Sequence, residues 1–76
     1  MLNEVEKGQR VRFVNKPSDP SFLPHYELTL EYLDRGKMYT VEHFFVGDPS
    51  QIELKGIEHM LFMTEMFELV EDAYAK

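Results

Sequence analysis

The sequence predicts an all-β fold, a small sandwich or barrel of four or five short strands. Apolar and polar residues alternate in several short segments, and turn signals containing glycine or proline separate them. The clearest alternation follows Gly36, in residues 39–45. One side of this segment is expected to face the core, with Tyr39, Val41 and Phe45, and the other side faces solvent, with Thr40 and Glu42. We take it as the central strand.

The chain of 76 residues predicts a single domain, with an ordered core over about 7–70 and a flexible tail over 71–76. A chain this short buries only about 60% of its unfolded surface, so its core must be dense in large side chains. Six Phe, four Tyr and five Met supply that density. The sequence has no cysteine, which excludes a disulfide framework and a thiolate metal site, and we expect no cofactor.

Residues 1–8 resemble no signal peptide, and no run approaches the roughly 20 apolar residues that cross a bilayer. We therefore expect a cytoplasmic protein without membrane contact. The net charge is −6, and residues 39–76 carry all of the acidic excess. Such a surface repels phosphate backbones, which disfavours nucleic acid as a partner.

The first strand is predicted from residues 10–14, where Val11 and Phe13 alternate with arginines on a basic outer face. Its lead-in, Lys7-Gly8, has the same form as Arg35-Gly36 before the central strand. This similarity indicates two strands entered by similar glycine turns. Residues 15–24 contain three prolines and are predicted to form a long loop.

Residues 25–33 are ambiguous. Apolar residues at 26, 28, 30 and 32 alternate with polar ones at 27, 29 and 31, which favours a strand or an extended arm. A short helix over residues 27–33 is the alternative.

The second half of the sequence is predicted to form two hairpins. A turn at Gly47-Asp48-Pro49-Ser50 leads to a strand over residues 51–54, in which Ile52 and Leu54 face inward. Residues 57–70 have two interpretations: an amphipathic helix, or a strand near Met60, a tight turn from Thr64 and a closing strand over 67–70. We favour the strands, because the helix would be apolar nearly all round. A short 3-10 turn fits before the last strand.

The segments Gly36-Lys37-Met38-Tyr39-Thr40-Val41, Ile52-x-Leu54 and Phe67-Glu68-Leu69-Val70 resemble a group of short SH3-like barrel proteins encoded by phages and by bacterial genomes that carry phage remnants. The resemblance covers mainly residues 7–14 and 33–70. It implies a partly open SH3-like barrel of about five strands. It implies no chemistry, since most of these proteins have no assigned activity.

No residue pattern predicts catalysis or a metal site. The histidines, His25, His43 and His59, are far apart in the sequence, and no glycine-rich phosphate loop occurs. A core filled by side chains leaves little room for a pocket that would separate the pKa values of two carboxylates. We therefore expect no enzyme activity and no metal.

These observations leave three functional hypotheses. We favour a non-catalytic protein-interaction module whose partner is an unknown protein or a second copy of the chain. Its predicted contact surface is an exposed apolar rim of Phe44, Val46, Met60, Met63 and Met66. The second is an acidic mimic of nucleic acid displaying Glu53, Glu58, Glu65, Glu68 and Glu71. The third is a weak nucleic-acid binder using Arg10, Arg12, Lys16 and Lys37.

Overall fold

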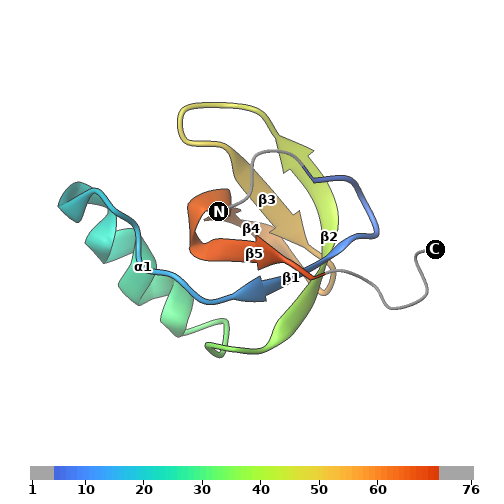
Figure 1. Cartoon of the computed structure of the whole chain (residues 1–76), viewed down its shortest axis with the longest axis horizontal. Coiled ribbons are helices and arrows are strands. Elements are labelled where there is room, and N and C mark those ends of the chain that lie inside the picture. Colours follow the sequence, from blue (N-terminus) through green and yellow to red (C-terminus); the bar gives the residue numbers. More distant parts are fainter. Residues whose placement is uncertain (1–4, 71–76) are drawn as a thin grey trace.

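The computed structural model describes residues 5–70 as a five-stranded antiparallel open sheet and one helix (Figure 1). The elements in chain order are β1 (Arg10–Phe13), η1 (Pro20–Phe22), α1 (Leu23–Leu30), β2 (Met38–Phe45), β3 (Gln51–Leu54), β4 (Ile57–Met63), η2 (Thr64–Met66) and β5 (Phe67–Leu69). The flexible tail predicted for residues 71–76 lies outside the described residues. The single helix corrects the all-β prediction.

The sheet has the order β4-β3-β2-β1-β5, and β2 lies at its centre as predicted. The first part of β2 pairs with β1, and the rest pairs with β3. The strands curl around a shared interior, and α1 lies to one side of the curled sheet (Figure 1). The long strand β2 therefore belongs to both halves of the sheet.

A bulge in β2 changes the predicted alternation. Val41 pairs with Leu54, and His43 pairs with Glu53, the residue before Leu54. Glu42 is therefore an extra residue on β2 with no partner on β3. An extra residue reverses which later side chains point inward. Phe44 therefore packs against the core, and Phe45 is 45% exposed. The predicted inward position of Phe45 is wrong for this reason.

Residues 57–70 form strand, 3-10 turn and strand, which confirms the favoured interpretation. The alternative helix would have left apolar side chains on every side. In the structure, β4, η2 and β5 turn Phe62, Met66 and Phe67 into the interior, where each has no exposed surface. The predicted 3-10 turn before the last strand is η2.

Residues 20–30 are helical, so the strand predicted near residues 25–33 is wrong. The Asp19 carboxylate accepts a hydrogen bond from the Ser21 N–H, and prolines follow at positions 20 and 24, where helix starts tolerate them. The buried residues Tyr26, Thr29 and Leu33 are three and four positions apart. That is the helical period, and it outweighs the alternation seen in the sequence.

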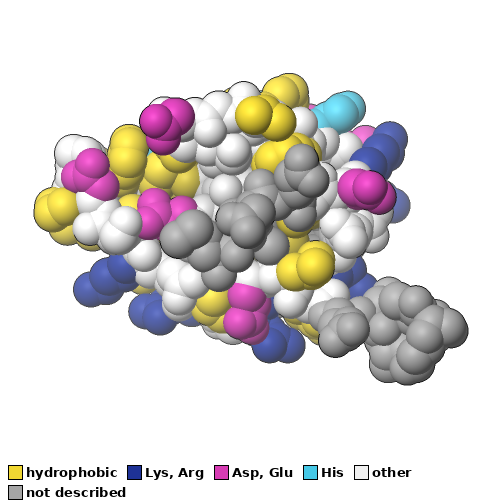
Figure 2. Space-filling model, turned by 45° about the horizontal axis from the view of Figure 1, so that its top comes forward, with side chains coloured by type: hydrophobic (Ala, Val, Ile, Leu, Met, Phe, Trp, Pro, Cys, Tyr) yellow, Lys and Arg dark blue, Asp and Glu magenta, His cyan; other side chains and the backbone are white. Residues whose placement is uncertain are grey.

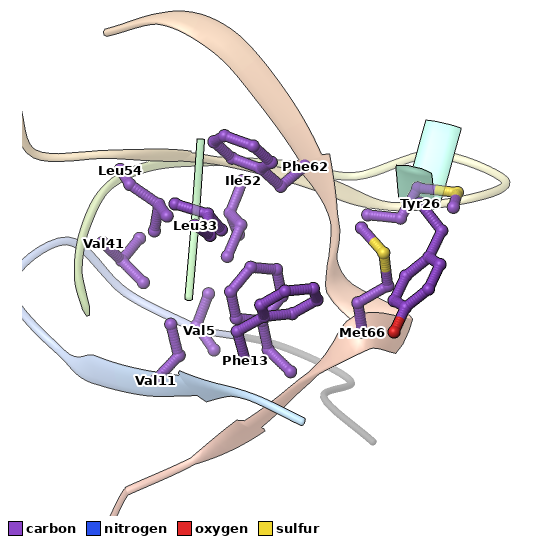
Figure 3. Close-up of a cluster of buried hydrophobic side chains, with 12 residues drawn as sticks. Val5, Val11, Phe13, Tyr26, Leu33, Val41, Ile52, Leu54, Phe62 and Met66 are labelled. Carbon is purple, nitrogen blue, oxygen red and sulfur yellow. The ribbon is translucent and has the colours of Figure 1, made fainter. Parts of the chain in front are cut away.

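The core lies between the two halves of the sheet (Figure 3). Twelve buried apolar side chains form it: Val5, Val11, Phe13, Tyr26, Leu33, Val41, Ile52, Leu54, Phe62, Met63, Met66 and Phe67. The ring of Phe13 contacts the rings of Tyr26 and Phe67 at centroid distances of 6.0 and 5.6 Å. Tyr26 thus joins α1 to the sheet.

Glycine turns precede β1 and β2, as the shared sequence pattern predicts. Gly8 and Gly36 have φ angles of +93° and +85°, which favour glycine. The N–H of Gly8 donates to the Val41 carbonyl, and the N–H of Gly36 donates to the Phe13 carbonyl. Each turn therefore fixes the register of the strand that follows it.

Neighbouring residues of β4 provide a test of this arrangement. Replacing Phe62, which is fully buried, by Ala leaves a cavity, and we expect the free energy of unfolding to fall by about 3–5 kcal/mol. Leu61→Ala removes a side chain that is 37% exposed and should cost about 1 kcal/mol or less. Urea unfolding measures both. Equal losses at the two positions would contradict the assignment of Phe62 to the inner face and Leu61 to the outer face of β4.

Candidate functional site

The structure separates the five residues predicted to form an exposed rim. Val46 is 83% exposed, and Phe44 and Met60 are partly buried against the core. Met63 and Met66 are 2% and 0% exposed, so their prediction as surface residues is corrected. They lie where β4 passes into η2, and this turn carries their side chains into the interior.

A different set of side chains lies together on the outer face of β2, β3 and β4. The pairing of the strands aligns His43, Glu53 and Leu61 in one row across the sheet. The ring of Phe45 lies 6.0 Å from the ring of His43, and the exposed Val46 follows Phe45 in the chain, just after the end of β2. We call these five residues the outer-face patch. Figure 2 shows hydrophobic side chains beside a histidine at the upper edge of the molecule.

The polar centre of the patch is a hydrogen bond between His43 and Glu53. Nδ1 of His43 lies 2.7 Å from Oε1 of Glu53, and since a carboxylate only accepts, the imidazole is the donor. The side chain of Glu53 is 14% exposed and that of His43 is 57% exposed. The patch thus combines exposed apolar surface with an enclosed carboxylate.

A second group of exposed apolar residues lies on and after α1, at the left of Figure 2. It comprises Leu23, Leu28, Leu30 and Tyr32. At 100° per residue, Leu23 and Leu30 lie on one flank of the helix and Leu28 lies on the other. The ring of Tyr32 contacts the ring of His59 on β4. These side chains are divided between two flanks and form no single surface.

The acidic residues of the predicted nucleic-acid mimic have several different local partners. Glu68 forms an ion pair with Arg12, Glu65 accepts two hydrogen bonds from Ser18, and Glu53 accepts one from His43. Glu58 accepts a bond from the Gly56 N–H. Glu71 lies outside the described residues.

Of the predicted basic residues, Arg12 is neutralised by Glu68 at 3.2 Å. Arg10 also has a partner, and Lys16 and Lys37 are exposed. Basic side chains line the lower edge of the molecule in Figure 2. Lys7 is likewise paired, with Glu42 at 3.2 Å.

The three histidines lie on different elements: His25 on α1, His43 on β2 and His59 on β4. Within residues 5–70, no group of three or more histidine, aspartate or glutamate side chains could hold a metal ion. Nε2 of His25 is buried and has no hydrogen-bond partner among the described residues. In that part of the chain, no helix has the length and hydropathy that crossing a bilayer requires.

A carboxylate holds the loop before η1 against η2. Oε2 of Glu65 accepts from the Ser18 N–H at 2.9 Å and from the Ser18 hydroxyl at 2.5 Å. Both bonds lower the pKa of Glu65, and the bond from the Ser18 hydroxyl has the larger effect. Next to Ser18, Pro17 is buried, and the N–H groups of residues 14 and 15 both donate to the Met66 carbonyl. The start of the long β1–α1 connection is therefore fixed to the sheet.

The chain matches no protein-family model, no curated protein and no solved structure. The site therefore rests on its own geometry. Sequence reasoning found Val46, missed Phe45 and Leu61, and assigned Glu53 to the acidic mimic of nucleic acid. The alternating pattern assigned Phe45 to the core, and only the bulge brings it to the outer face. Glu53 and Leu61 become neighbours through the pairing of β3 with β4.

The Glu65 contact predicts a pH dependence. The folded-state pKa lies below the ordinary value of 4.5, so the contact stabilises the fold above pH 4.5 and is lost as the pH falls through the folded pKa. Glu65→Gln should lower the free energy of unfolding at pH 7 and flatten its decline below pH 4.5. Chemical unfolding at a series of pH values tests this. Glu27, whose side chain makes no hydrogen bond or ion pair among the described residues, is the control, and Glu27→Gln should keep the wild-type profile.

Proposed function

We propose that the protein is a non-catalytic interaction module that binds another protein through the outer-face patch. The observation that carries this proposal is the exposure of Phe45 and Leu61 on the outer face of a paired sheet, with the exposed Val46 directly after Phe45 in the chain. Single exposed apolar residues are ordinary, whereas adjacent ones around a polar centre are typical of contact surfaces. The half of β2 that carries His43 and Phe45 is hydrogen-bonded to β3, and β3 is hydrogen-bonded to β4 on its other side, so paired strands support this surface.

We also infer that the sheet is an SH3-like, partly open barrel. Three features support this: the antiparallel meander of β1 to β4 with β5 returning to pair with β1, the sharing of β2 between two halves, and the 3-10 turn before β5. The long connection between β1 and β2 corresponds to an extended loop, here containing α1. A fold of this class gives no activity by itself.

The hydroxyl groups of the serines support the non-catalytic proposal. Those of Ser18 and Ser21 donate to carboxylates, and that of Ser50 donates to the Gly47 carbonyl. None of the three hydroxyls is hydrogen-bonded to a histidine within residues 5–70, and a nucleophile of the serine–histidine type needs that contact.

A matched pair of variants on β2 tests the proposal. Phe45→Ser alters the patch, and Met38→Ser alters the other end of the strand, where Met38 is 42% exposed, close to the 45% of Phe45. Wild-type and variant proteins are immobilised, and captured proteins from a lysate of the native host are quantified by mass spectrometry. We expect one partner that Met38→Ser retains and Phe45→Ser reduces at least tenfold.

Equal retention by the two variants would contradict the proposed face, as would a wild-type protein that captures nothing above a blank resin. Sedimentation equilibrium of the purified protein is the control for self-association. A dimer that Phe45→Ser dissociates would assign the patch to a second copy and would overturn the proposal of a different partner protein.

A further inference from the structure

The most enclosed carboxylate of the outer face has a histidine as its partner and, within residues 5–70, no lysine or arginine. The side chain of Glu53 is 14% exposed, compared with 24% for Glu42 and 47% for Glu68, which pair with Lys7 and Arg12. Enclosing a carboxylate is unfavourable unless a cation or several hydrogen bonds compensate. Within residues 5–70, the carboxylate of Glu53 forms a single hydrogen bond, to His43, and no ion pair with a lysine or arginine.

The carboxylate has capacity for another donor. Oε1 of Glu53 is taken by Nδ1 of His43, while Oε2 has no hydrogen-bond partner among the described residues. A carboxylate accepts up to about four hydrogen bonds. Lys55 lies two positions along the chain and forms no ion pair with it.

The neighbours of Glu53 favour one kind of cation. Leu61 lies beside it on β4, and the rings of Phe45 and His43, 39° apart in plane, lie on the β2 side. A guanidinium group is planar, is more weakly hydrated than an ammonium, donates to a carboxylate through two N–H groups and stacks on aromatic rings. The aliphatic part of an arginine side chain can cover Leu61 at the same time.

We propose that the outer-face patch binds an arginine side chain of the partner protein, with the guanidinium paired to Glu53 and stacked on Phe45. This rests on the proposed function and names the chemistry of its partner. A different protein is favoured over a second copy, because the chain's own arginines are already engaged. Arg12 pairs with Glu68, Arg35 donates to Val14 and Tyr26, and Arg10 also has a partner.

The test uses the full chain and three synthetic peptides. The probe is acetyl-Gly-Leu-Arg-Leu-Gly-amide, and the controls replace its arginine by lysine or by citrulline, which is neutral and nearly isosteric. Titrations are followed by amide chemical shifts. We expect shifts confined to β2, β3 and β4, and an affinity for the arginine peptide at least tenfold above that for the citrulline peptide.

Glu53→Gln should abolish the preference for arginine over citrulline, while Glu68→Gln, which alters an exposed carboxylate on β5, should keep it. Phe45→Leu retains an apolar side chain without the ring and should reduce the preference for arginine over lysine. Equal binding of the arginine and citrulline peptides would overturn the inference, as would shifts at other elements or an unchanged preference in Glu53→Gln.

The capture experiment separates this inference from the proposed function. A partner that Phe45→Ser loses and Glu53→Gln retains in full leaves the face in place and overturns the arginine contact. A partner that both variants lose, with Met38→Ser unaffected, supports both. The amide spectra of the unliganded variants show whether each remains folded. If Glu53→Gln does not fold, the loss of preference for arginine over lysine in Phe45→Leu tests the patch instead.

Discussion

The extra residue in β2 is the constraint on which the surface of this protein depends. Before the bulge, Val41 faces the core and pairs with Leu54; after it, Phe44 faces the core and Phe45 faces out. Without the bulge, Phe45 would lie inside and the outer row would lose its ring. A bulge also increases the local twist of a strand. The same feature therefore allows one strand to serve both halves of the sheet and exposes an aromatic residue.

Much of the fold could be predicted because local patterns and core packing agree. The strands at β1, β3 and β4, the turn at η2 and the glycine turns follow from alternation and from residues that favour positive φ. The helix at residues 20–30 could not be predicted in this way, since the apolar residues there fit both the two-residue period of a strand and the 3.6-residue period of a helix. The buried positions 26, 29 and 33 are chosen by contacts with the sheet, such as that of Tyr26 with Phe13.

The site was less predictable than the fold, because its members meet only across strands. Met63 and Met66 have the flexible side chains expected of a contact surface, yet both are buried, because a small domain needs its large apolar side chains to fill the core. Glu53, in contrast, occupies an outward position of an alternating strand, where a polar side chain is ordinary and indicates no site. Its enclosure follows from neighbours on β2 and β4 that no pattern within residues 51–54 reveals.

Core filling does not explain why Phe45 is aromatic. The structure tolerates polar residues at outer positions of the same strand, as the partly exposed Thr40 shows, so a polar residue at 45 would satisfy the sheet equally well. The same reasoning applies to Glu53, where an apolar or neutral residue would avoid enclosing a charge. Two neighbouring choices that the fold does not require, one aromatic and one anionic, have complementary roles toward a single planar cation. That coincidence makes the outer face, and neither flank of α1, the surface on which a partner is expected.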